Sequence, residues 1–281
     1  IRIEPGAQPN ESDVVIVWRQ RLLPFRLSIG ADDSGSKATG KYQGNITLSL
    51  DNPLGLSDLF YVSYGRELGH KNTLTNYSGI RTDSGTRSYV LHYSFPFGKW
   101  LWAVNHNGYR YHQAVAGLSE NYDYNGRSHN TDIGFTRLLY RDARRKTHFG
   151  MKVWWRESQS FVNDAEIDVQ RRRTAGWSAN LSHKEYFGNA ILNLAINYKR
   201  GTGMQDALRA PEEKFGEGTS RMKIISATAD FNQPFQIGRQ TFAYDISIHA
   251  QWNKSPLTPQ DKLAIGGRYT VRGFDGELSL S

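Results

Sequence analysis

The chain has 281 residues, a formal net charge of +8 and a mean hydropathy of −0.61. It contains no cysteine, which excludes disulfides, thiol catalysis and cysteine metal sites. A positive charge is compatible with nucleic acid, anionic lipid or acidic partners. The basic residues are spread along the chain rather than gathered in one compact block, so the sequence predicts no nucleic-acid partner.

Residues 1–21 differ in pattern from the rest of the chain. Pro5 and Gly6 predict a turn, and a nearly continuous apolar run follows at residues 14–18. We expect this run to be the last strand of a small soluble domain. The Leu-Leu-Pro stretch at residues 22–24 would join it to a second domain that covers residues 22–281.

From residue 24 onward, apolar and polar residues alternate with a period of two, which is typical of β-strands. These segments are about ten residues long, a length that crosses a bilayer when the strand is tilted. Strands of soluble sandwiches more often have about five or six residues. Lipid-facing and lumen-facing residues average out in mean hydropathy, so the negative value does not exclude a membrane protein. The pattern predicts an all-β fold, an antiparallel transmembrane β-barrel.

Eleven strands are predicted, and two of them, 131–141 and 221–232, alternate poorly. The strands cover residues 24–32, 41–51, 58–67, 87–96, 100–114, 131–141, 147–160, 173–186, 190–200, 221–232 and 240–252.

The gaps between these strands alternate in length. The even gaps are short, at residues 52–55, 96–99, 142–146, 188–189 and 235–239. The odd gaps are longer and polar, at residues 33–40, 69–86, 117–130, 163–172 and 201–220. Short periplasmic turns and long outer loops are typical of bacterial outer-membrane barrels.

Aromatic residues gather beside the short turns, which predicts an aromatic girdle at one membrane interface. The alternative is a soluble β protein with ordinary aromatics at its strand ends. The residues concerned are Phe60, Phe95, Phe97, Trp100, Trp102, Tyr186, Phe187, Phe231, Phe235 and Phe242.

The polar faces of the strands supply candidate lumen residues, namely Lys152, Arg156, Lys199, Asp245 and His249. They are either the wet interior that every large barrel has, or the wall of a conduit that passes an unfolded chain through weak contacts. The eight histidines are scattered, and no His/Asp/Glu group has ligand spacing, so we expect no metal and no cofactor. No nucleotide-binding or hydrolase motif is present, so no enzymatic activity is predicted.

Near the end of the chain, residues 266–277 read GGRYTVRGFDGE. Together with the long strands and the N-terminal segment, this stretch resembles the Omp85 superfamily, and within it the two-partner secretion transporters called TpsB proteins. Three stretches carry the resemblance: SDVVIVWRQ at 12–20, ADDSGSKATGKYQGNITLSLDNPLGLSDL at 31–59, and LTPQDKLAIGGRYTVRGF at 257–274.

The resemblance implies a barrel of sixteen strands, of which about eleven lie here. Residues 1–21 would be the end of a periplasmic POTRA domain, and residues 257–281 would be part of the family's loop L6. We therefore expect the protein to continue beyond both ends of the chain. An L6 motif of Val271, Arg272, Gly273 and Phe274 would sit in the lumen, with Gly266 and Gly267 forming a re-entrant hairpin that tolerates positive φ. Arg272 would act as a structural latch, paired with an aspartate of a later strand.

The implied function is export across the bacterial outer membrane. The cargo would be a TpsA-type exoprotein, which is a large β-helical haemolysin, adhesin or contact-dependent inhibition toxin. Outer-membrane lipid would surround a barrel that we expect to be monomeric. The alternative is an Omp85-type insertase that assembles other barrels, since insertases share VRG(F/Y) and POTRA domains. The DNPLG turn and the LTPQDKLAIGG stretch favour the secretion branch, and residues 1–21 and 271–274 argue against a passive porin.

Overall fold

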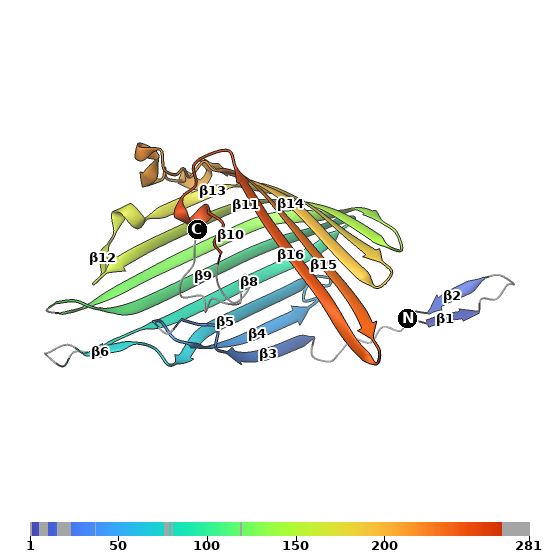
Figure 1. The fold of residues 1–281 in the computed structure, drawn as a ribbon, viewed down its shortest axis with the longest axis horizontal. Helices are drawn as coiled ribbons and strands as arrows, with labels where there is room; N and C mark the ends of the chain where they lie inside the picture. The colour runs from blue at the N-terminus through green and yellow to red at the C-terminus, as the bar shows by residue number, and fades with distance from the viewer. Residues whose placement is uncertain are drawn as a thin grey trace.

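The structure, a computed structural model, describes residues 2–5, 11–15, 24–36, 38–75, 79, 81–118 and 120–265. Its main feature is a 12-stranded antiparallel sheet in which each long strand pairs with the next one along the chain (Figure 1). The long strands are β3 (Phe25–Asp32), β4 (Tyr42–Asp51), β5 (Leu59–Gly69), β8 (Gly85–Phe97), β9 (Trp100–Ala116), β10 (Asn121–Arg141), β11 (Arg145–Val162), β13 (Arg172–Phe187), β14 (Ala190–Thr202), β15 (Lys223–Ile237) and β16 (Gln240–Asn253). All eleven predicted strands are thus confirmed.

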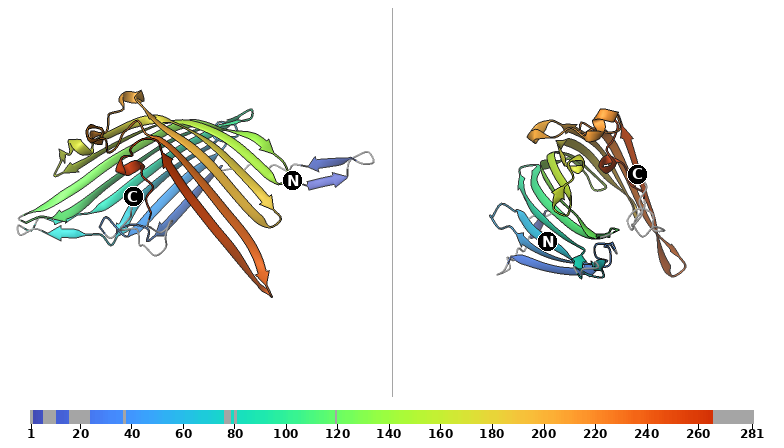
Figure 2. Two further views of the ribbon diagram at one scale, coloured as in Figure 1. Left: turned by 45° about the horizontal axis from the view of Figure 1, so that its top comes forward. Right: turned by 90° about the vertical axis from the view of Figure 1, so that its left-hand side faces the viewer.

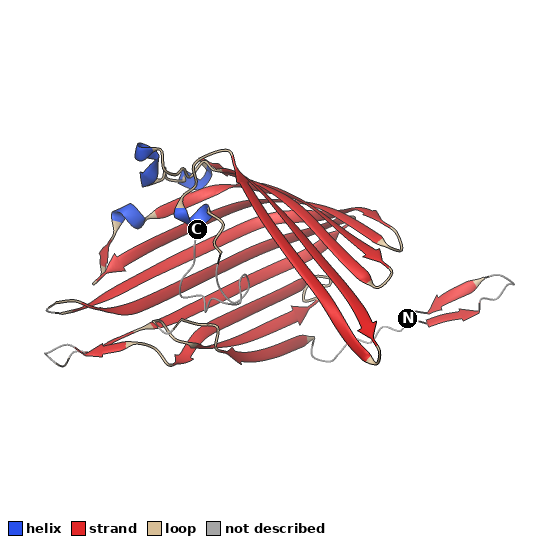
Figure 3. Cartoon of the chain, viewed as in Figure 1, coloured by secondary structure: helices blue, strands red, loops and turns tan. Residues whose placement is uncertain are grey.

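Short elements lie outside this path. Strand β12 (Ala165–Glu166) pairs with β11. Two separate two-stranded sheets are formed by β1 (Arg2–Pro5) with β2 (Ser12–Val15) and by β6 (Thr73–Thr75) with β7 (Arg81–Asp83). In the part of the chain that the structure describes, four 3-10 helices lie outside the strands, at η1 (Asp168–Gln170), η2 (Met204–Asp206), η3 (Pro211–Phe215) and η4 (Pro259–Asp261) (Figure 3). Among the described residues, no helix is long and apolar enough to cross a membrane.

One predicted loop is wrong. Residues 121–130 were expected to lie in a loop, but they belong to β10, which pairs with β9 from Asn121 onward. The connection between β9 and β10 is therefore short, at residues 117–120. This polar stretch has no apolar face, but strand pairing still satisfies the hydrogen-bonding capacity of its backbone N–H and C=O groups. In the N-terminal segment, β2 begins at Ser12, before the predicted run, and residues 16–18 of that run lie outside the described residues.

The sheet curls into an open trough (Figure 2). Cross-strand pairs place apolar side chains on its outer face, such as Leu181 beside Ile196, which are 46% and 55% exposed. The polar residues of the same strands line the inside. Such an exposed apolar surface is the face that a barrel turns toward lipid.

Two rows of aromatic residues flank the apolar part of the outer face. The first lies at the short turns, where Phe97 pairs with Trp100, and Phe235 stacks on Phe242 with ring centroids 5.6 Å apart. The second lies toward the opposite ends of the strands, on the same face, and consists of Tyr64, Tyr89, Trp155, Trp177, Tyr198 and Trp252. Two aromatic rows of this kind mark the two interfaces of a membrane-spanning sheet.

Candidate functional site on the inner wall

The inner face of the trough carries a cavity of about 330 Å³. Strands β10, β11, β13 and β14 form its wall, and Lys152, Arg156 and Lys199 line it together with residues of the 203–222 loop and of η4. The two-residue period places the three cations on one face. The predicted candidates on β11 and β14 are thus brought together.

Lys152 begins a chain of hydrogen bonds across four strands. Its Nζ donates to Oδ1 of Asp132 at 3.1 Å, and Oδ2 of Asp132 accepts from Nδ2 of Asn105 at 2.6 Å. Oδ1 of Asn105 lies 2.6 Å from Nδ1 of His92, whose Nε2 lies 3.0 Å from Oγ of Ser94. The Asp132 side chain is only 12% exposed, so the Lys152 ammonium compensates a largely buried carboxylate. This part of the wall is therefore polar, and the Lys152 and Asp132 charges neutralise each other.

The segment that follows β16 is attached to this wall. Lys199 Nζ donates to Oδ1 of Asp261 at 2.9 Å, and Gln251 Nε2 donates to the Asp261 carbonyl at 3.0 Å. Oδ2 of Asp261 accepts from the Thr258 hydroxyl at 3.1 Å. Because the Asp261 side chain is 9% exposed, its charge is held by these partners rather than by solvent.

A small apolar cluster lies under the same segment. It consists of Trp154, Met222, Ile224 and Leu257, all buried, and the Lys199 ammonium lies 4.7 Å from the centre of the Trp154 ring. Gly176 makes room for the cluster, since a Cβ there would lie 2.8 Å from the Trp154 ring and 2.0 Å from the Arg200 carbonyl oxygen. Apolar burial and the ion pair thus fix residues 254–261 together.

The Glu213 carboxylate joins several parts of the 203–222 loop. Oε1 of Glu213 accepts from the Thr219 hydroxyl at 2.7 Å, from the Ser220 amide at 3.1 Å and from the Ala210 amide at 3.4 Å. Burial raises the pKa of Glu213, but the hydrogen bonds from Thr219, Ser220 and Ala210 outweigh it and hold that pKa below its ordinary value. The Thr219 amide also donates to the Pro256 carbonyl at 3.2 Å, so loop and segment support each other.

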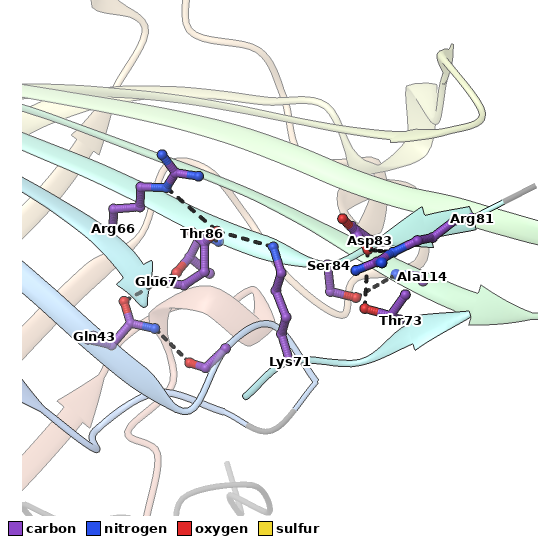
Figure 4. A network of polar contacts seen from close by, with 11 residues as sticks. Gln43, Arg66, Glu67, Lys71, Thr73, Arg81, Asp83, Ser84, Thr86 and Ala114 are labelled. Atoms are coloured by element: carbon purple, nitrogen blue, oxygen red, sulfur yellow. Dashed lines mark hydrogen bonds and ion pairs between the residues drawn. The ribbon is translucent and has the colours of Figure 1, made fainter. Parts of the chain in front are cut away.

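A second buried carboxylate fixes the outer end of β5. Glu67, whose side chain is 5% exposed, accepts from the Thr86 amide at 3.1 Å and from Lys71 Nζ at 3.4 Å (Figure 4). Arg66 approaches the same carboxylate only to 3.7 Å. This network ties β5 and the residues that follow it to β8.

The other predicted site residues lie elsewhere. On β16, Asp245 accepts a hydrogen bond from Asn232 at 2.5 Å, and His249 stands opposite Thr228. Both share a face with Gln251 but do not line the cavity. The L6 residues Gly266, Gly267, Val271, Arg272, Gly273 and Phe274 lie outside the described residues.

Sequence reasoning missed Asp132 and Asp261, the carboxylates that pair with Lys152 and Lys199. Asp132 belongs to a poorly alternating strand, and Asp261 lies in a connection, so neither has a periodic signal. The LTPQD stretch was noted as a point of resemblance, and its position could have suggested an inner partner for a wall lysine. Within the described part of the chain, no group of three or more His, Cys, Asp or Glu residues could hold a metal.

Long antiparallel strands, an apolar outer face between two aromatic rows, and a polar inner face define the wall of an outer-membrane β-barrel. The family model of the haemolysin secretion/activation proteins ShlB/FhaC/HecB matches residues 10–281, so the chain belongs to this family of two-partner secretion transporters.

Relatives and solved structures agree with this assignment. The outer membrane transporter CdiB-2 of Burkholderia pseudomallei is 31% identical over 283 residues, which cover 100% of this chain and 46% of that protein. The hemolysin transporter HpmB of Proteus mirabilis is 23% identical, over 98% of this chain and 47% of that protein. The structure of CdiB from Acinetobacter baumannii is 32% identical with a TM-score of 0.75, and covers 93% of this chain and 44% of that one. The chain thus spans about half the length of the relatives that it matches.

Proposed function

We propose that this protein is an outer-membrane translocation pore that exports a large secreted exoprotein by two-partner secretion. The main structural support for this proposal is the attachment of residues 254–261 to the inner wall through Lys199 and Gln251. This segment leads directly into the VRGF stretch, so its attachment supports an L6 loop that begins inside the barrel. Relatives named as CdiB and haemolysin transporters favour secretion over the insertase alternative.

The inner wall suits such a cargo. Two of its lysines are compensated within the wall, in the Lys152–Asp132 and Lys199–Asp261 pairs, while Arg156 has no ion pair among the described residues. An unfolded chain would meet a polar wall whose charges are compensated in part, and it would bind there weakly. In this proposal Arg156, Asp245 and His249 also face the moving chain. The cargo would be a haemolysin, an adhesin or a contact-dependent inhibition toxin, and no bond is made or broken.

Within this proposal, Arg272 is the latch of L6. Val271, Gly273 and Phe274 shape the tip, and Gly266 and Gly267 form the hairpin. A guanidinium inside a barrel needs a carboxylate or carbonyl partner, which would hold the loop in place. Residues 1–21 would belong to a POTRA domain that receives the cargo by strand augmentation. Outer-membrane lipid would surround a monomeric barrel.

The test compares Arg272→Ala with Arg268→Ala in the full-length protein. Both substitutions remove an arginine from the same glycine-rich stretch. We expect Arg272→Ala to abolish export and Arg268→Ala to leave it intact, with exoprotein blotted in medium and periplasm and heat-modifiability as the folding control. Full export by Arg272→Ala would contradict the latch. Failure of other barrels to assemble would indicate an insertase.

A further inference from the structure

Four arginines form a row across neighbouring strands on the outer face. In the register of β5, β8, β9 and β10, Arg66 stands opposite Arg87, Arg87 opposite Arg110, and Arg110 opposite Arg127. Side chains that face each other across antiparallel strands have Cβ atoms about 4.5–5.5 Å apart, and like charges there repel. All four side chains are exposed. This arrangement is costly unless an anion lies beside it.

The described residues compensate the row only in part: Asp123 and Asp164 line the groove beside Arg110 and Arg127, and Glu166 accepts a hydrogen bond from Gln159 at 3.0 Å. Arg87 and Arg110 make no hydrogen bond or ion pair within the described part of the chain. Arg66 reaches Glu67 only at 3.7 Å, and that carboxylate is already bound by Lys71 and the Thr86 amide. Arg127 donates to the neutral Oε1 of Gln159 at 2.7 Å and lies 5.4 Å from the Phe161 ring.

The row lies at the membrane interface rather than in an outer loop. On β5 and β8, Arg66 and Arg87 come one same-face step beyond Tyr64 and Tyr89 of the second aromatic row. On β5 and β8, apolar residues such as Leu91 continue from there toward the short turns. On β9 and β10, His106, His129 and Thr131 come first, and the apolar residues begin at Val104 and Ile133. A lipid whose chains cover that apolar face would place its headgroup beside the arginines.

A shallow groove of about 510 Å³ continues the row. Arg110, His112, Asn125, Arg127 and Phe161 line it, together with Asp123 and Asp164 on the loop side. Asp123 accepts a hydrogen bond from Asn125 at 3.1 Å. The groove thus offers two guanidinium groups next to an aromatic ring, a combination suited to a phosphorylated sugar.

We propose that the row of Arg66, Arg87, Arg110 and Arg127 binds the phosphate groups of an outer-leaflet glycolipid, whose acyl chains cover the apolar face below. Each guanidinium donates to a phosphate oxygen, and the anion relieves the repulsion between the cross-strand neighbours. The site concerns the lipid-facing surface and does not depend on export.

The test uses the full-length protein in detergent and bis-phosphorylated lipid A as the probe, with bound lipid counted by native mass spectrometry. Arg87, Arg110 and Arg127 are replaced together by Gln. The control replaces Lys99, Arg144 and Arg239 of the short turns by Gln, which changes the net charge equally. We expect the row variant to bind roughly 100-fold more weakly, because each arginine near a membrane surface contributes about fivefold. The control variant should bind like the wild type.

Further binding measurements distinguish a phosphorylated lipid from free phosphate as the ligand. Dephosphorylated lipid A should bind the wild type as weakly as the phosphorylated lipid binds the row variant, and inorganic phosphate should not displace the lipid. Equal binding of both lipids, equal binding by both variants, or displacement by phosphate alone would overturn the proposal. If the row variant fails the heat-modifiability control, a salt titration on the wild type decides instead, since a phosphate–arginine contact must weaken with ionic strength.

Discussion

Lys199 has two partners on the inner wall, the Asp261 carboxylate and the Trp154 ring. A cation between a carboxylate and an indole face is favourable because both contacts act on the same partly buried charge. Nearby, the Lys152 ammonium likewise donates a hydrogen bond to the Asp132 carboxylate. At the scale of single residues, therefore, each of these lysines is paired with a largely buried carboxylate, and removing the lysine leaves that carboxylate without its charged partner.

Replacing Lys199 by Met should loosen residues 254–265. We expect a loss of about 1–2 kcal/mol in the local opening free energy, because a charge-assisted hydrogen bond and a cation–π contact are both lost. Hydrogen–deuterium exchange of the peptide that contains the Asp261 amide measures it. Lys262→Met is the matched control, since the exposed Lys262 makes no ion pair among the described residues. Equal exchange in the two variants would show that the ion pair does not anchor the segment.

Glu213 should make the 203–222 loop sensitive to acid. Its pKa is lowered in the folded protein, so its contribution to stability is present above the ordinary value of 4.5 and is lost as pH falls through the lower folded value. A nitroxide on a cysteine that replaces the exposed Glu217 should gain mobility in that window, measured by electron paramagnetic resonance. In a Glu213→Gln background the mobility should be high at every pH. An unchanged spectrum down to pH 3 would refute the prediction.

Each long strand has an apolar face on the outside of the trough and a polar face on the inside. On β14, Leu194 and Ile196 lie on the outer face, while Asn193 and Lys199 lie on the inner face. The same alternation recurs on neighbouring strands because paired residues share a face. A one-residue slip in register would exchange the two faces over the whole strand, so the register is fixed by the membrane as much as by the turns.

The two faces of β14 predict a large stability cost for one substitution and a small cost for another, three residues away on the same strand. Ile196→Arg should cost about 2–4 kcal/mol in vesicles, because it places a charge in the bilayer. Asn193→Arg should cost much less, because that side chain lies on the polar face near Asp230. Urea unfolding of the full-length protein in lipid vesicles gives both values. Comparable losses at the two positions would mean that the faces are assigned wrongly.

The same alternation explains what the sequence could predict. Strands with one apolar face, such as those around Val153 and Ile246, stand out by their period of two, and the short turns follow from the gaps. The outer half of β10 could not be found, because residues 121–130 show no apolar face. Backbone pairing and side-chain contacts such as Tyr89 with His129 and Tyr111 with Tyr124 hold this stretch in the sheet. The pairing of Lys199 with Asp261 was equally hidden, since it joins residues 62 positions apart in the chain.

At the scale of the molecule, the trough separates an inner polar surface from an outer apolar one. In the function proposed above, the inner surface is the path of a moving chain, and the cavity between β10 and β14 shows which side chains line that part of it. Adjacent residues on one strand therefore face either the path or the lipid. The chain has no cysteine, so single cysteines can be introduced anywhere as reporters.

A stalled exoprotein should crosslink to the inside of the trough only. We expect Lys152→Cys to form a disulfide with a cysteine in a cargo that is arrested during export, and the neighbouring Val153→Cys to form none. Mixed disulfides are read on non-reducing gels of whole cells. Crosslinks at residue 153 in place of residue 152 would place the path outside the trough and contradict the proposed conduit.

The order of the strands has a consequence for how the sheet is made. Every long strand pairs with the one that precedes it in the chain, so each new hairpin needs only the edge left by the last one. Some of the connections are short and others are longer, such as residues 203–222, but the closure entropy grows only slowly with loop length. The sheet can therefore grow from β3 to β16 one hairpin at a time, and at each stage the exposed edge is the next docking position. A growing sheet of this kind never has to search for a distant partner strand.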